Sequence, residues 1–286
     1  MTELYEKIGY KKLMVVPLIF LALCLGFLLL NYTNTGEFFI KGVDLEGGAQ
    51  LTVETSQNVD ASSLETHLRQ EFGDVQVRTT VGVGTNNILI RAGEDVDKDL
   101  LLESVRNYGI DVESHSFEKI GAALGESFFV QSRTALIIAF VFMGFVVFFV
   151  FRSLVPSVAV MLAAFSDIIC TIAVMQVFGL SLSLASFAGL LLVLGYSIDT
   201  DILLTTRVIK RREGNIEERI RGAFKTGITM TFTTLVALTA LYLVSGATAL
   251  KEISTVLIIA LLIDLPNTWL TNLGILRLWS ERKGLT

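Results

Sequence analysis

Charged and conformationally restrictive residues are scarce in this chain. Only 18% of its 286 residues are charged and only three are proline, whereas 52% are hydrophobic. Soluble domains are about 25% charged, so this composition favours a protein that is dissolved in a lipid bilayer. The net charge of −5 supplies no overall basic field, and we therefore exclude binding to a nucleic acid.

The residue types that build catalytic and metal sites are also few. Cys24 and Cys170 lie in apolar runs without metal-ligand spacing, which predicts packed thiols rather than a disulfide framework. The two histidines, His67 and His115, form no metal-binding pair, and no nucleotide-binding loop or nucleophile elbow is present. We therefore expect a protein that is not an enzyme and that binds no cofactor or metal.

Long hydrophobic runs are what the chain has in abundance. The first, Leu13–Leu30, follows three lysines and no small-residue cleavage site comes after it, which predicts an uncleaved anchor. Five further runs are long enough to cross about 30 Å of hydrocarbon as helices. They cover residues 134–151, 157–178, 183–206, 227–247 and 253–276. The prediction is a membrane α-helical protein with six transmembrane helices.

The positions of lysine and arginine predict the orientation. Basic residues gather at the N-terminus, at Arg152, in the loop 207–225 and near the C-terminus. Because cytoplasmic loops are rich in such residues, both termini of this multi-pass cell-membrane protein should be cytoplasmic. The predicted parts are an N-terminal anchor (1–33), an extracytoplasmic domain with its linker (34–131) and five membrane helices (132–286).

The basic loop, with a short surface helix at Ile216–Phe224, either only sets topology or also binds anionic lipid.

The segment 34–131 has the character of a folded α+β domain. Its apolar residues alternate or recur at helical spacing, and Asp60 is placed to cap a helix. The expected elements are a strand over Val43–Thr55 broken by Gly47-Gly48, a helix over Asp60–Phe72, strands over Val75–Val81 and Asn87–Ala92 joined by a turn, a helix over Asp97–Tyr108 and a strand over Val112–Phe117. This β-α-β-β-α-β order predicts a ferredoxin-like fold.

Ionisable residues inside the predicted spans are the candidates for function. They are Asp167, Asp199, Asp201 and Asp264, with Lys225 at the start of the fifth helix. An aspartate at mid-span costs roughly 2.5–3.5 kcal/mol on insertion scales, so each needs a partner, a water cavity or a proton. Residues 199 and 201 are about 200° apart on a helix and should face different surfaces.

A hydroxyl stripe accompanies these charges on the fifth helix. Thr226, Thr229 and Thr233 recur at three- and four-residue steps after Lys225. A carboxylate that faces these hydroxyls and an ammonium group would suit a proton relay. The alternative is that the aspartates and threonines only hold neighbouring helices together through hydrogen bonds. In the sixth span, Pro266 should kink the helix beside Asp264.

Four motifs resemble those of a known family. The segment Gly42–Ala49, GVDLEGGA, resembles the glycine-pair motif of SecD and SecF, with Gly47 and Gly48 as the pair. The segment GYSIDTDILLTTR, Gly195–Arg207, is similar to their fourth-helix motif. The segment KTGITMTFTT, which begins at Lys225, resembles their threonine-rich fifth-helix motif, and Ser166-Asp167 is similar to the third-helix pair. The chain resembles the SecF subunits of archaeal SecD/SecF protein-export complexes.

The resemblance implies a role and partners. The chain would act with SecD at the SecYE translocation channel as half of an RND-like repeat, and would use proton flow to move outside domains that hold the exported, unfolded polypeptide. Asp199 is similar in position to the aspartate of SecD, and we expect Asp199→Asn to impair export more than Asp201→Asn. Two alternatives stay open: a proton-coupled small-molecule exporter of the resistance–nodulation–division kind, and a structural scaffold of the channel.

The predicted orientation can be tested by labelling. Cysteines introduced at Ser62 or Asp97 should react with an impermeant thiol reagent added outside intact cells, and a cysteine at Asn215 should not, because basic residues favour the cytoplasmic side. Labelling of the cysteine at Asn215 in sealed cells would contradict the orientation.

Overall fold

The computed structural model describes residues 9–81, 86–210 and 215–283. The chain divides into two compact units. The helical unit comprises Met1–Phe39, Ala135–Phe178 and Ala185–Thr286, and the sheet-containing unit comprises Ile40–Thr134 and Gly179–Leu184.

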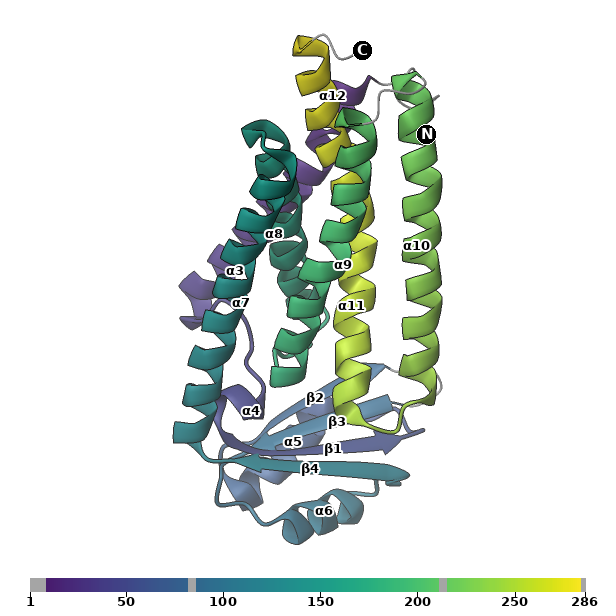
Figure 1. The fold of residues 1–286 in the computed structure, drawn as a ribbon. Coiled ribbons are helices and arrows are strands. Elements are labelled where there is room, and N and C mark those ends of the chain that lie inside the picture. Colours follow the sequence, from purple (N-terminus) through teal and green to yellow (C-terminus); the bar gives the residue numbers. More distant parts are fainter. Residues whose placement is uncertain (1–8, 82–85, 211–214, 284–286) are drawn as a thin grey trace. The chain divides into compact units, whose positions relative to one another are not determined.

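Five helical segments are long and apolar enough to cross a membrane, judged by length and composition over the described residues. They are Tyr10–Thr35, Ala122–Phe151, Leu154–Val177, Leu184–Ile209 and Ile216–Val244. The first consists of α2 (Tyr10–Leu13) and α3 (Val15–Thr35), and the others are α7, α8, α9 and α10 (Figure 1). Where we expected a sixth span, the chain forms α11 (Thr248–Pro266), the π-helix η1 (Asn267–Asn272) and α12 (Leu273–Arg282). The six-span count is therefore not confirmed.

The loop predicted over residues 207–225 is shorter in the structure. Helix α9 continues to Ile209, and α10 begins at Ile216, so the expected surface helix is the first part of α10. Ile216, Ile220 and Ala223 are buried at helical spacing in a core cluster with Leu273 and Leu276 of α12. Burial of this apolar stripe explains why the helix does not stop before the membrane segment.

Other packing in the helical unit agrees with the sequence analysis. Cys24 of α3 and Cys170 of α8 are buried free thiols that belong to one apolar cluster, as predicted. Ile263 of α11 completes the same cluster. Helix α8 therefore packs against both α3 and α11.

The second unit contains the predicted ferredoxin-like sheet. Its strands are β1 (Gly48–Thr55), β2 (Gln76–Val81), β3 (Asn86–Ala92) and β4 (Ser114–Ile120), and its longer helices are α5 (Ala61–Phe72) and α6 (Lys98–Asn107). The spatial order is β2-β3-β1-β4 with every neighbouring pair antiparallel. The β-α-β-β-α-β order is confirmed, while the turn predicted at 82–87 falls mostly outside the described residues.

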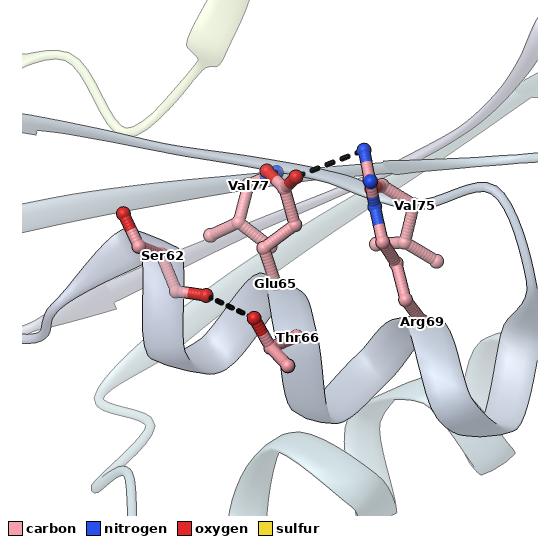
Figure 2. A network of polar contacts seen from close by, with 6 residues as sticks. All are labelled: Ser62, Glu65, Thr66, Arg69, Val75 and Val77. Carbon is pink, nitrogen blue, oxygen red and sulfur yellow. Dashed lines mark hydrogen bonds and ion pairs between the residues drawn. The ribbon is translucent and has the colours of Figure 1, made fainter.

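Side-chain contacts hold α5 against the sheet. Asp60 caps the helix by accepting hydrogen bonds from the backbone N–H of Ser62 and Ser63. Figure 2 shows Glu65 and Arg69 pointing from α5 toward β2, where the Glu65 carboxylate accepts from the Val77 N–H at 2.9 Å. Leu64 and Leu68 on the same face are fully buried in the core. Helix and strand are thus joined by both apolar and polar contacts.

The glycine-pair motif differs from the expected strand. Residues Val43–Glu46 form the short helix α4, and the strand begins only at Gly48. Gly47 and Gly48 have φ values of 91° and 110°, which L side chains rarely adopt. A Cβ on Gly47 would lie 2.4 Å from the Cα of Ala122, at the start of α7. The glycines are therefore required both by the backbone conformation and by the close approach of α7.

The same motif also holds the segment Gly179–Leu184 within this unit. The Gly42 N–H donates to the Leu182 carbonyl at 2.6 Å, and the Leu182 N–H donates to the Ile40 carbonyl at 2.8 Å. The Asp44 carboxylate accepts from the Leu184 N–H. The pKa of Asp44 is raised, mainly because the carboxyl group is buried. Its hydrogen bonds lower the pKa by a smaller amount.

The close approach at Gly47 predicts the effect of a side chain there. Gly47→Val should lower the stability of the chain by about 1–3 kcal/mol, because it adds both backbone strain and overlap with Ala122. Thermal unfolding of the purified chain would show a lower midpoint. Gly93→Val is the matched control, since a Cβ at Gly93 meets nothing within 4 Å, and equal midpoints for the two variants would contradict this account of the motif.

Candidate functional site

Three carboxyl groups are buried together in the helical unit. Asp167 and Asp201 have no solvent-exposed surface, and Asp264 is 1% exposed. They come from three helices, α8, α9 and α11 respectively. Residues far apart in the sequence are thus brought into one polar cluster inside an otherwise apolar bundle.

Two hydroxyl groups connect the three carboxyl groups. The Ser197 Oγ lies 2.6 Å from Asp167 Oδ2 and 2.9 Å from Asp264 Oδ1. The Thr268 Oγ1 lies 2.9 Å from Asp264 Oδ1 and 2.9 Å from Asp201 Oδ1. The side chains therefore form a continuous chain of contacts from Asp167 to Asp201, with Asp264 in the middle.

Two amide groups complete the cluster. Asn267 Nδ2 donates to Asp167 Oδ1 at 2.6 Å, and Asn272 Nδ2 donates to Asp201 Oδ1 at 2.7 Å. Both asparagines are almost fully buried. We define the polar cluster by its seven members: Asp167, Ser197, Asp201, Asp264, Asn267, Thr268 and Asn272.

The π-helix positions three of these side chains. Asn267, Thr268 and Asn272 all belong to η1, which follows directly after Pro266. Proline has no N–H, so the ordinary α-helical hydrogen bond from position 266 is absent. After this position the helix continues as a π-helix. Such segments occur frequently at functional sites. The backbone irregularity therefore coincides with the polar cluster.

The buried acids have no buried basic side chain beside them in the described part of the chain. Among the described residues, no lysine, arginine or histidine is buried. The described residues also contain no group of three or more His, Cys, Asp or Glu side chains placed to hold a metal ion. An uncompensated carboxylate in an apolar interior is costly, so the cluster needs protons or another source of positive charge.

The structure places the other predicted residues elsewhere. Asp199 is exposed on α9, so it and Asp201 do face different surfaces. Lys225, Thr229 and Thr233 are exposed on α10, and the structure does not bring them to the buried carboxyl groups. The Thr229 hydroxyl donates to the Lys225 carbonyl at 2.8 Å, and the Thr233 hydroxyl donates to the Thr229 carbonyl at 3.0 Å. The threonine stripe is satisfied by its own helix.

The family-motif residues are more dispersed. Arg207 Nη2 donates to the Thr226 hydroxyl at 3.2 Å and so links α9 to α10. A Cβ on Gly195 would meet nothing within 4 Å. Neither residue contributes a contact to the polar cluster, and Gly47 and Gly48 belong to the other unit.

Four members of the cluster were not predicted from the sequence. Ser197, Asn267, Thr268 and Asn272 are neutral and were not counted among the ionisable candidates. A signal was present, because three of them lie within eleven residues of Pro266 and Asp264 in a predicted apolar span, and Thr268 is one helical turn from Asp264. Polar side chains within a span usually face the bundle interior.

Comparisons with known proteins agree on one family. Residues 101–282 match the family described as protein export membrane protein SecD/SecF, C-terminal. The chain is 39% identical over 284 residues to the protein-export membrane protein SecF of Pyrococcus furiosus, covering 99% of this chain and 95% of the relative. It is 40% identical over 279 residues to the protein of the same name from Methanolacinia petrolearia, covering 96% of this chain and 95% of the relative.

A solved structure has the same fold. The crystal structure of SecDF, a translocon-associated membrane protein from Thermus thermophilus, superposes with a TM-score of 0.75 at 20% identity. The match covers 96% of this chain and 38% of the SecDF chain. This chain therefore corresponds in fold to a little over a third of SecDF.

The amide contacts predict a stability effect. Asn267→Leu should lower the stability of the chain by about 1–3 kcal/mol, because it leaves a buried carboxyl oxygen of Asp167 without its donor. The midpoint of thermal unfolding of the purified chain in detergent would measure the loss. Thr233→Val, which removes an exposed hydroxyl bonded only within its helix, is the control, and a midpoint for Asn267→Leu as high as that of Thr233→Val would contradict the role of the amide.

Proposed function

The chain belongs to the SecD/SecF family of protein-export membrane proteins, and from this membership we propose that it couples proton flow to polypeptide export through the buried polar cluster. A multi-pass membrane location and a role in protein translocation follow from the family and the fold. The proton coupling, the partners and the orientation are our proposals.

The observation that carries the proposal is the burial of Asp167, Asp201 and Asp264, with no basic side chain buried among the residues that the structure describes. Ionisable residues are rare inside membrane proteins, and where they occur they commonly serve proton relays or ion paths. Hydrogen bonds that only hold neighbouring helices together would not need three acids on three helices. The arrangement suits a site that gains and loses protons.

Movement of the helices would link this site to the rest of the protein. Burial favours the neutral form of a carboxyl group, whereas access to water favours the charged form. A shift of α9 relative to α8 and α11 would change that access, so protonation and conformation become coupled. The gradient across the membrane would then drive the outside domain, 34–131, through cycles of movement against the exported polypeptide.

The exposed polar residues suggest where a partner binds. Asp199, Lys225, Thr229 and Thr233 are exposed on α9 and α10, and charged groups within a span require a protein partner or water in the bilayer. We propose that SecD covers this surface, since a coupling-ion path usually lies between two repeats. SecYE and the unfolded polypeptide would be the further partners, with both termini of the chain in the cytoplasm.

The alternatives are less well supported. A small-molecule exporter does not agree with relatives that are named as protein-export proteins over nearly their whole length. A structural scaffold would explain the membrane helices but would not require a carboxyl cluster free of basic residues. The two remaining hypotheses, proton coupling and a structural scaffold, predict different effects on export when an aspartate is replaced by asparagine.

The proposal predicts the order of defects for asparagine variants. Asp201→Asn should reduce the gradient-dependent part of export to the level seen without the protein, because it removes a titrating group from the cluster while preserving its shape. We now expect Asp199→Asn to be milder, the reverse of the order expected from the sequence, because Asp199 lies outside the cluster. Export of a secreted reporter with and without an uncoupler would measure the effect.

Controls separate this outcome from loss of assembly. Each variant should copurify with SecD as the unsubstituted chain does, and Asp95→Asn, the same change at an exposed position of the other unit, should export normally. Full gradient-dependent export by an assembled Asp201→Asn variant would overturn the proposed role of the cluster and favour the scaffold.

A further inference from the structure

The glycine-pair motif, Gly42–Ala49, takes no part in the polar cluster, yet it lies where the chain passes between its two units. The backbone passes between them at residues 39–40, 134–135, 178–179 and 184–185. The motif follows closely after the first passage, and the second lies on α7, whose start approaches Gly47. The last two passages bound Gly179–Leu184, a segment that the motif also holds. The motif is therefore placed beside each covalent connection of the sheet-containing unit.

Three hydrogen bonds hold this segment to the motif. The Gly42 N–H donates to the Leu182 carbonyl at 2.6 Å, and the Leu182 N–H donates to the Ile40 carbonyl at 2.8 Å. The Asp44 carboxylate accepts from the Leu184 N–H. We call this set of contacts the α9 junction and define it by the five residues that make them. All five belong to the sheet-containing unit.

The third bond of the α9 junction is a helix cap. Leu184 is the first residue of α9, and the first N–H groups of an α-helix have no acceptor within the helix. Aspartate is among the preferred capping residues, and its negative charge is favoured at a helix N-terminus. Asp44 lies 140 positions before Leu184 in the sequence. A distant segment of the sheet-containing unit thus supplies an acceptor to the helix that carries Asp201.

The α9 junction also explains the glycine at position 42. Gly42 has φ −71° and ψ 164°, extended values that any residue adopts, so its backbone conformation does not require glycine. A Cβ there would overlap the Asp44 carboxylate, and it would lie 3.2 Å from the Leu182 carbonyl oxygen and 3.3 Å from the Ser183 Cα. A side chain at this position would therefore displace the capping carboxylate or separate the two segments.

These contacts stiffen the connection between α9 and the sheet-containing unit. A free connecting segment absorbs the movement of a helix through changes in its own φ and ψ angles, whereas the hydrogen bonds of the α9 junction oppose such changes. We propose that Asp44 is a positioning residue for export, which through the α9 junction passes movement of α9 to the sheet-containing unit. This inference rests on the proposed function, in which α9 moves.

Removal of the capping carboxylate tests the proposal. Asp44→Ala should abolish the gradient-dependent part of reporter export and leave the part that persists with an uncoupler, because movement of α9 no longer reaches the sheet-containing unit. Hydrogen exchange of Gly179–Leu184, measured by mass spectrometry on the full chain in lipid vesicles, should become roughly fivefold faster, as expected for the loss of one helix cap. Unchanged exchange, or full gradient-dependent export, would overturn the proposal.

A second cap in the same unit provides the matched control. Asp60 caps α5 by accepting from the N–H groups of Ser62 and Ser63. Asp60→Ala removes the same kind of contact, so it should lower the midpoint of thermal unfolding about as much as Asp44→Ala. It should nevertheless export normally and leave the exchange of Gly179–Leu184 unchanged. An equal export defect in Asp60→Ala would assign the effect to general loss of stability and overturn the proposal.

Two further variants separate the cap from the charge. Asp44→Asn should retain export, because asparagine caps helices about as well as aspartate and because burial already favours the neutral form of this carboxyl group. Gly42→Ala should reproduce the defect of Asp44→Ala, since its side chain would displace the carboxylate. An asparagine variant as defective as Asp44→Ala, or normal export by Gly42→Ala, would contradict the role of the cap.

The outcomes for Asp44→Ala and Asp201→Asn distinguish this inference from the proposed function. If Asp201→Asn abolishes gradient-dependent export and Asp44→Ala does not, the α9 junction has no role in export while the proton coupling stands. If Asp201→Asn exports normally, the proton coupling fails. An export defect in Asp44→Ala, with Asp60→Ala normal, would then still show that export depends on the α9 junction.

Discussion

The cost of burying three carboxyl groups in an apolar bundle is the constraint on which the rest of the helical unit depends. Asp167, Asp201 and Asp264 lie on separate helices and are almost completely shielded from solvent. Because no basic side chain is buried among the described residues, the hydrogen-bond donors that the fold supplies to these groups are hydroxyl and amide groups. Hydrogen bonds thereby join the helices α8 and α9 to α11 at one point.

The irregular backbone after Pro266 is the second part of this solution. Asn267, Thr268 and Asn272 all contact the carboxyl groups of the cluster from η1. The π-helix is a local departure from ideal geometry that is offset by these hydrogen bonds. The polar contacts of the cluster and the irregular backbone therefore coincide in η1.

The sheet-containing unit is built on a different constraint, the close packing around Gly47. The positive φ values of Gly47 and Gly48 turn the chain from α4 into β1, and the missing side chain lets the start of α7 approach. Hydrogen bonds from the same motif hold the segment that leads into α9. The sheet-containing unit includes both the motif and this segment. Because the segment continues directly into α9, the unit is covalently joined to the helix that carries Asp201.

Elements with a strong periodicity were predictable from the sequence. Hydrophobic length identified five of the membrane-spanning segments, and alternation together with the cap Asp60 identified the β-α-β-β-α-β domain, because these signals are local. It also identified each of the buried acids, since an aspartate within an apolar run is conspicuous. Sequence patterns did not predict that Asp201, and not Asp199, joins Asp167 and Asp264. Helical spacing shows that two residues face apart but not which of them faces inward, and that choice depends on how α8, α9 and α11 pack. The same packing recruits neutral Ser197, Asn267, Thr268 and Asn272, whose role exists only when segments distant in the sequence meet.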